Sequence, residues 1–109
     1  MGEKKKFALV TGGSRGIGKA ICLQLAMDTE YTILINYKEN ASAAQETLSE
    51  IEKIGGNAEL IQFNVSDNKD VQNKLDLWHE TNKGAIIEVI VNNAGITKDG
   101  LFMWMKPED

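Results

Sequence analysis

The sequence of 109 residues predicts an α/β fold with a doubly wound parallel sheet. Two observations lead to this prediction. Short apolar stretches alternate along the chain with longer stretches of helical periodicity, and a glycine-rich turn directly follows the first apolar stretch. Strands that alternate with helices pair in parallel, and the connecting helices then cover both faces of the sheet. The whole chain, 1–109, is therefore expected to belong to one domain.

Four short apolar segments are the expected strands. They are 7–10, 32–35, a segment within 58–65, and 86–91, which is the most apolar of the four. Continuous apolar runs of this length are typical of strands that are buried on both faces. Because crossovers between parallel strands are right-handed, the favoured strand order is 3-2-1-4, and ligands bind where the first and fourth strands end.

Three longer segments have the apolar spacing of amphipathic helices. The first spans about 16–27 with Ile17, Ile21 and Leu25 on one face, and the second spans 41–54 with Ala41, Ala44, Leu48 and Ile51 on one face. The third follows a Ser66 or Asp67 cap and carries Val71, Leu75 and Trp78. Glycines at 55–56 and 84 end the second and third helices. Beyond Ile96 the chain is rich in Met and aromatic residues, and Pro107 is typical of the start of a further helix.

The composition indicates an acidic protein of the cytoplasm. Its net charge is −4, from 12 basic and 16 acidic side chains, which argues against nucleic acid and anionic membranes as partners. No apolar run approaches the ~20 residues that a membrane helix needs, and the N-terminus lacks the pattern of a signal peptide. The single cysteine, Cys22, lies in an apolar helical segment and is expected to be a small core residue in a reducing compartment.

The glycine-rich turn, residues 11–18, joins the first strand to the first helix. Glycines let the backbone approach a pyrophosphate, and a helix N-terminus offers it free N–H groups and a favourable dipole. In this position the motif predicts a dinucleotide site. A phosphotransferase P-loop is disfavoured because Ala20 stands where a Mg²⁺-binding Ser or Thr is needed. A methyltransferase is disfavoured because Asn36, and not an acidic residue, ends the second strand.

Three motifs in order resemble the signatures of the short-chain dehydrogenase/reductases. They are Thr11-Gly12-x-x-x-Gly16-Ile17-Gly18, Asn64-Val65-Ser66-Asp67 and Asn92-Asn93-Ala94-Gly95. Within that family, residues 14–18 and 93–99 are most similar to the bacterial 3-oxoacyl-acyl-carrier-protein reductases. The resemblance extends from about residue 5 to residue 109 and implies a dinucleotide-binding fold of the Rossmann type.

The resemblance also implies a role for each motif in holding the cofactor. The pyrophosphate turn would be lined by Gly12, Gly16 and Gly18, with Ile17 near the nicotinamide half. Adenine would be held by Asn64 and Val65, and the cofactor would run along Asn92, Ala94 and Gly95 after the fourth strand. One asparagine of the 92–93 pair would also brace the central strand.

The end of the second strand and the glycine turn predict NADP(H) in preference to NAD(H). Asn36 stands where an NAD-selective site has Asp or Glu, so no carboxylate repels a 2′-phosphate. Arg15 could hold that phosphate through two hydrogen bonds, with a hydroxyl from Ser14 and a second positive charge from Lys38. Tyr37, between Asn36 and Lys38, completes the expected site.

The family's catalytic Asn, Ser and Tyr-x-x-x-Lys residues follow the third motif, and the chain ends at Asp109 before any of them. We therefore expect the cofactor half of a reductase, without catalytic residues and without a metal site. The resemblance implies hydride transfer from NADPH to a 3-oxoacyl thioester, free or bound to acyl carrier protein, in fatty acid synthesis by a homotetramer. The alternatives are a dehydrogenase for another alcohol or ketone and a non-catalytic dinucleotide-binding module.

Overall fold

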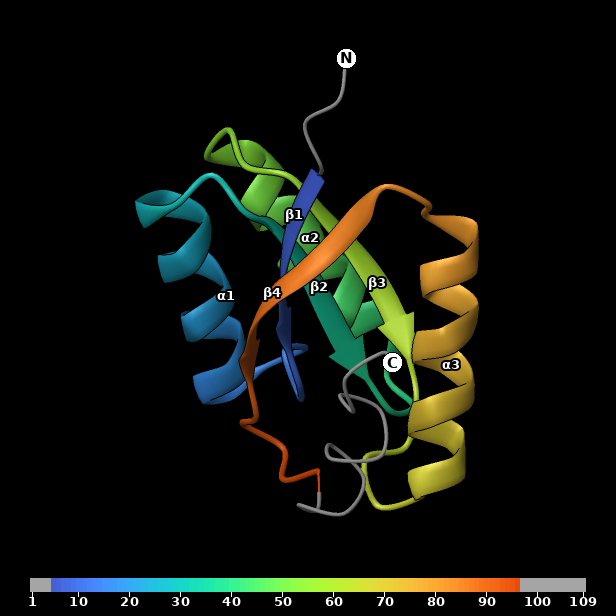
Figure 1. Ribbon diagram of the computed structural model, residues 1–109. Helices are drawn as coiled ribbons and strands as arrows, with labels where there is room; N and C mark the ends of the chain where they lie inside the picture. Colours follow the sequence, from blue (N-terminus) through green and yellow to red (C-terminus); the bar gives the residue numbers. More distant parts are fainter. Residues whose placement is uncertain (1–4, 97–109) are drawn as a thin grey trace.

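The computed structural model describes residues 5–96, which form one parallel sheet of four strands with helices on both faces (Figure 1). The strands are β1 (Lys5–Val10), β2 (Thr32–Tyr37), β3 (Ala58–Gln62) and β4 (Ala85–Val91). Their order is β3-β2-β1-β4, and every adjacent pair is parallel. The predicted fold class and strand order are confirmed. The Met-rich segment after Ile96 and the helix predicted near Pro107 lie outside the described residues.

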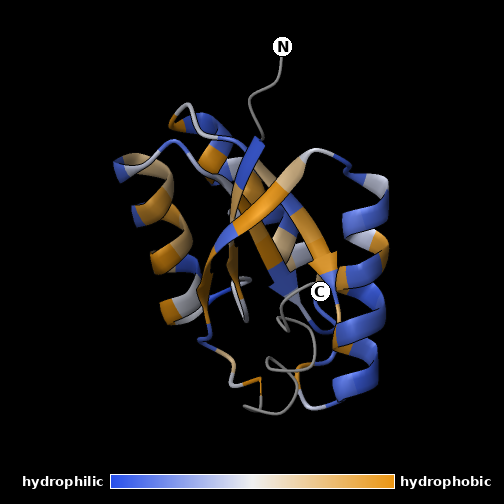
Figure 2. Ribbon diagram, in the orientation of Figure 1, coloured by the Kyte–Doolittle hydropathy of each residue, from blue (hydrophilic) through white to orange (hydrophobic). Residues whose placement is uncertain are grey.

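The helices cover the sheet from two sides. Helices α1 (Gly16–Asp28) and α2 (Ala41–Lys53) pack on one face, and α3 (Asn68–Thr81) packs on the other. Side chains of β1 alternate between the faces: Phe7 and Leu9 pack toward α3, whereas Ala8 and Val10 pack toward α1 and α2. Both faces of the strand are therefore apolar, which explains its continuous apolar sequence. Figure 2 shows the hydrophobic strands in the middle and a largely hydrophilic α3.

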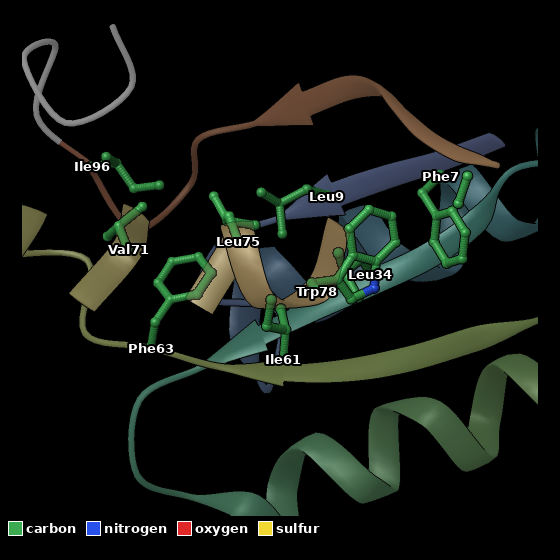
Figure 3. Close-up of a cluster of buried hydrophobic side chains, with 10 residues drawn as sticks. Phe7, Leu9, Leu34, Ile61, Phe63, Val71, Leu75, Trp78 and Ile96 are labelled. Carbon is green, nitrogen blue, oxygen red and sulfur yellow. The ribbon is translucent and has the colours of Figure 1, made fainter. Parts of the chain in front are cut away.

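The core between the sheet and α3 is built on aromatic rings (Figure 3). Phe7 and Trp78 meet edge to face, with ring centroids 4.8 Å apart and planes at 83°. Such a pair contributes roughly 0.5–1.5 kcal/mol beyond the area that it buries. Val71, Leu75 and Trp78 are all buried, which confirms the face predicted for the third helix.

The buried face of α1 differs from the predicted one. Ile17 is 74% exposed, and the fully enclosed residues of this helix are Gly18 and Cys22. Ile21 and Leu25 are half-buried and pack against the core, so the prediction is wrong only at the first of its three positions. The reason is the close approach of the first helical turn to the loop after β1, which leaves room for glycine and none for a larger residue. In α2, likewise, Thr47 is buried and Ala41 is exposed.

Cys22 is a core residue, as predicted. Its side chain is buried beneath the glycine turn, with Sγ 4.0 Å from the carbonyl oxygen of Gly13, and burial raises the pKa of the thiol to about 12. Because the thiolate is the reactive form, we expect no alkylation of Cys22 by iodoacetamide in the native protein at neutral pH. Mass spectrometry should find one adduct only after denaturation. Rapid labelling of the native protein would contradict this burial.

The register of the sheet determines where the site lies. Val10 is opposite Ile35 of β2 and opposite Val91 of β4, so these three strands end at the same edge. The loop that follows β1 and the loop that follows β4 therefore emerge next to each other. The ends of parallel strands at such a switch in strand order are where ligands bind in open α/β sheets.

Candidate dinucleotide-binding site

Thr11 connects the two loops at the edge of the sheet. Its backbone N–H donates to Val91 O at 3.0 Å, and its hydroxyl donates to Asn92 Oδ1 at 3.3 Å. The same hydroxyl oxygen accepts a hydrogen bond from the N–H of Ala94 at 2.9 Å. Thr11 is completely buried, so these bonds fix the loop after β4 onto the end of β1. Sequence analysis gave Thr11 no separate role, although it opens the first motif.

Both asparagines that follow β4 hold this arrangement together. Asn93 Nδ2 donates to Gly12 O at 3.3 Å. Asn92 closes its own loop, since Oδ1 accepts from Ile96 N at 2.7 Å and Nδ2 donates to Ile96 O at 2.9 Å. Both side chains thus bond to residues just past β1, Asn92 to Thr11 and Asn93 to Gly12, which is consistent with the expectation that an asparagine of this pair braces the central strand. Ala94 and Gly95 are exposed beside them.

The glycines of the turn have different structural reasons. Gly12 has φ of +65°, and a Cβ there would lie 2.9 Å from Ala94 Cβ. A Cβ on Gly18 would collide with the carbonyl oxygen of Gly12 and lie 2.8 Å from Asn93 Nδ2. Gly16 has φ of +62°, but a Cβ there would meet nothing within 4 Å. Gly12 and Gly18 thus let backbone segments of the protein cross closely, whereas Gly16 borders open space.

The N-terminus of α1 is the one helix start among residues 5–96 without a side-chain cap. Arg15 is its N-cap residue and makes no capping hydrogen bond with its side chain, and the first turn contains no acidic residue. By contrast, Asn40 accepts from Ala43 N–H in α2, and Asp67 accepts from two N–H groups in α3. The first N–H groups of α1 are left for an anion, which the helix dipole also favours.

Helix α2 holds the glycine turn from the side. The buried Thr47 donates from its hydroxyl to Ser14 O at 3.0 Å, and Lys19 of α1 forms an ion pair with Glu50. The hydrogen bond with Glu50 raises the pKa of Lys19. Sequence reasoning missed Thr47, and its only signal was a polar residue between Ala44 and Ile51 on the apolar face of the helix.

Asn36 lies at the end of β2, but its side chain does not face the open side of the site. It was placed in the cofactor site, as the neutral residue at the position of an NAD-selective Asp or Glu, but its side chain is 1% exposed and turned into the protein. Its Oδ1 accepts from Gly12 N at 3.0 Å, and its Nδ2 faces the carbonyl oxygens of Ile61 and Phe63. It lies on the same face of β2 as Leu34, which packs in the α3 core, so the alternation of the strand directs it inward.

The neighbours of Asn36 in the expected NADP(H) site lie nearer the surface. Tyr37 is half-buried and packs against the core beneath α1 and α2. Lys38 is exposed, and its carbonyl oxygen accepts from Gln62 Nε2 at 2.7 Å. Arg15 is exposed, and Ser14 is half-buried next to it. In the described part of the chain, the ion pairs involve neither Arg15 nor Lys38.

The loop after β3 carries the residues expected to hold adenine. Asn64 accepts from Ser66 N at 3.0 Å and from Ser66 Oγ at 2.7 Å through the same Oδ1, and its own N–H donates to Asp70. Val65 is half-buried and packs against the α3 core. Asn64 Nδ2 has no hydrogen-bond partner among the described residues and is thus free to donate to a ligand.

The described residues give no support to a metal site or a membrane span. Within 5–96, no group of three or more His, Cys, Asp or Glu side chains is arranged to hold a metal ion. In the same segment, no helix has both the length and the apolar character needed to cross a bilayer.

Comparison with known proteins gives one consistent family. The family model described as short chain dehydrogenase matches residues 6–109. A 3-oxoacyl-[acyl-carrier-protein] reductase of Synechocystis sp. is 44% identical over 102 residues, which are 94% of this chain and 40% of that protein. The short-chain dehydrogenase/reductase homolog YusS of Bacillus subtilis is 42% identical over 98 residues, which are 90% of this chain and 87% of that protein.

Solved structures agree with the sequence relatives. A short chain dehydrogenase from Burkholderia cenocepacia J2315 in complex with NADP superposes with a TM-score of 0.70 at 39% identity. The match covers 91% of this chain and 43% of that protein. The chain thus spans about two fifths of the length of the curated reductases and of this solved structure.

Proposed function

Because this chain belongs to the short-chain dehydrogenase family, we propose that it binds NADP(H) where the loops after β1 and β4 meet. The observation that carries the proposal is the uncapped start of α1 beside those loops, with the open space at Gly16 in front of it. The pyrophosphate of a dinucleotide supplies the missing acceptors. A related solved structure contains NADP, which supports a nicotinamide dinucleotide as the ligand.

The residues of the site fit such a cofactor. Its pyrophosphate would lie against the amides of Gly16, Ile17 and Gly18, while Gly12 shapes the turn. Asn64 and Val65 would contact adenine, and Asn92, Ala94 and Gly95 would flank the nicotinamide side. Arg15, Ser14, Tyr37 and Lys38 would surround the 2′-phosphate end. When bound, NADPH supplies a hydride to a ketone.

For the full-length protein we propose the reduction of a 3-oxoacyl thioester carried by acyl carrier protein, by a homo-oligomer. The support is the 44% identity to a 3-oxoacyl-[acyl-carrier-protein] reductase. A second candidate is a non-catalytic dinucleotide-binding module, favoured by the short relative YusS, which this chain matches over 87% of its length. NADPH oxidation on addition of a 3-oxoacyl thioester supports the first candidate. NADPH binding without turnover of this or other ketones supports the second.

Replacing Gly16 with valine tests the pyrophosphate site. Valine would fill the open space in front of the α1 amides, so we expect NADPH affinity to fall by at least about tenfold, or ~1.4 kcal/mol. Isothermal titration calorimetry on the native protein and the variant measures this change. Gly84→Val is the matched control, because Gly84 also has a positive φ and open surroundings. It directly precedes β4, at the amino ends of the strands and thus far from the proposed site at their carboxyl ends. Equal NADPH affinity in Gly16→Val and the native protein would refute the proposed site.

A further inference from the structure

Asn36 is the most deeply buried amide side chain among residues 5–96, and it joins three parts of the sheet edge. Through Oδ1 it accepts the N–H of Gly12 in the glycine turn at 3.0 Å. Through Nδ2 it reaches Ile61 O at 3.4 Å and Phe63 O at 3.2 Å, at the end of β3. Its own backbone oxygen accepts the N–H of Gly13 at 2.9 Å, so two consecutive amides of the turn are bonded to this one residue.

The surroundings of this side chain suit an amide and no other common group of that size. One side presents a donor, the Gly12 N–H, and the other presents only acceptors, the carbonyl oxygens of Tyr37, Ile61 and Phe63. A carboxylate could accept from Gly12 but would face the carbonyls without a proton. An unsatisfied or repelled polar group in a buried position is costly, so the rest of the network would move away from it.

The bonded segments are the two that the proposed cofactor would span. Gly12 begins the turn for the pyrophosphate, and Phe63 immediately precedes Asn64 of the adenine loop. We propose that Asn36 is a positioning residue that fixes the distance between the pyrophosphate turn and the adenine loop. This inference rests on the proposed dinucleotide site. It touches neither half of the cofactor. Its loss should weaken NAD⁺ and NADP⁺ alike, because the segments it aligns contact the parts that both dinucleotides share.

The replacement Asn36→Asp tests this role. Above its pKa the buried carboxylate repels the carbonyls of β3, so the affinities for NADP⁺ and NAD⁺ should both fall roughly ten- to a hundredfold at about pH 8. Burial raises the pKa of such a carboxyl group, and the protonated acid can donate to Phe63 O again. The ratio of the variant's dissociation constant to that of the native protein should therefore approach one near about pH 5.5.

Charged groups on the neighbouring elements are either paired with one another or, like Arg15 and Lys38, exposed to solvent, and they should not produce this profile. Among the described residues, Lys5 pairs with Glu59, Lys6 with Glu88, and Lys74 with Asp70. Tyr37, Lys38 and Glu59 are the titratable groups nearest in sequence to the bonded atoms, and Asp70 accepts from Asn64 N. Taking the ratio to the native protein at each pH removes their titration and that of the 2′-phosphate. Asn40→Asp is the matched control, because the exposed Asn40 caps α2 through an oxygen that aspartate retains.

Calorimetry on the full-length protein measures both dinucleotides across this pH range, and circular dichroism restricts the comparison to folded samples. If Asn36→Asp is unfolded at the higher pH, Asn36→Ser replaces it, with both affinities expected to fall by a factor that does not change with pH. Tighter NAD⁺ binding by Asn36→Asp would show that the side chain faces the ribose and would overturn the inference. Native affinity in both variants would also overturn it. A native protein that binds neither dinucleotide would overturn the proposed function, and this inference with it.

Discussion

Replacing Gly18 with alanine is expected to lower the free energy of unfolding by about 3 kcal/mol, at the upper end of the usual cost of overpacking. The added methyl group would collide with Gly12 O and lie 2.8 Å from Asn93 Nδ2. Neither group can easily retreat. Gly12 is held at its N–H by Asn36, and Asn93 is itself bonded to Gly12 O. Urea unfolding followed by circular dichroism measures the loss.

Gly55→Ala is the control for this experiment. Gly55 has φ of +89° and no neighbour within 4 Å of an added Cβ, so alanine there introduces backbone strain of roughly 1–2 kcal/mol without a collision. Gly18, inside α1, has the reverse situation, because a helical backbone favours alanine and only the collision opposes it. A Gly18→Ala protein as stable as the native one would mean that α1 does not approach the loop after β1 this closely.

The fold, and the meeting of the two loops that form the candidate site, could be predicted from the sequence because both follow from periodicity and chain order. The apolar runs of β1 and β4 identify buried parallel strands, and right-handed crossovers leave few arrangements of four such strands. Once that order is given, the loops that begin at Thr11 and Asn92 must emerge together. No contact had to be known for this step.

The direction of single side chains could not be predicted in the same way. The sequence shows that Asn36 ends a strand, but alternation alone does not tell whether the amide faces a ligand or the α3 core. Ile17 has helical spacing with Ile21, yet it is exposed because Gly18 takes the position against the loop. In the sequence, Thr47 is only a polar residue that interrupts an apolar helix face, and its role becomes clear from its hydrogen bond to Ser14 O. In each case tertiary contact decides the orientation, and local propensity carries no information about it.

Arg15 is expected to account for most of the preference for NADP(H). It is the only arginine of the sequence, it is exposed beside the uncapped start of α1, and no ion pair among residues 5–96 engages its guanidinium. The end of β2 carries no acidic side chain, because Asn36 is neutral and turned inward and is followed by Tyr37 and, just past the strand, by Lys38. A 2′-phosphate at this corner would therefore meet positive charge from Arg15 and Lys38 and no opposing carboxylate from these residues.

Arg15→Ala should weaken NADPH binding about ten- to a hundredfold, the value of a charge-assisted contact of roughly 1.5–3 kcal/mol, and leave NADH binding nearly unchanged. Arg15→Lys retains the charge without the two-pronged geometry and should give an intermediate loss. Lys83→Ala removes an exposed charge just before β4, at the opposite edge of the sheet, and should affect neither dinucleotide. Calorimetry at low and high salt completes the test, because an exposed contact with phosphate weakens as ionic strength rises. Equal losses for NADH and NADPH in Arg15→Ala would place this side chain on the shared pyrophosphate. Native protein that binds NADH as tightly as NADPH would refute the assignment of the 2′-phosphate to the site beside Arg15 and Lys38.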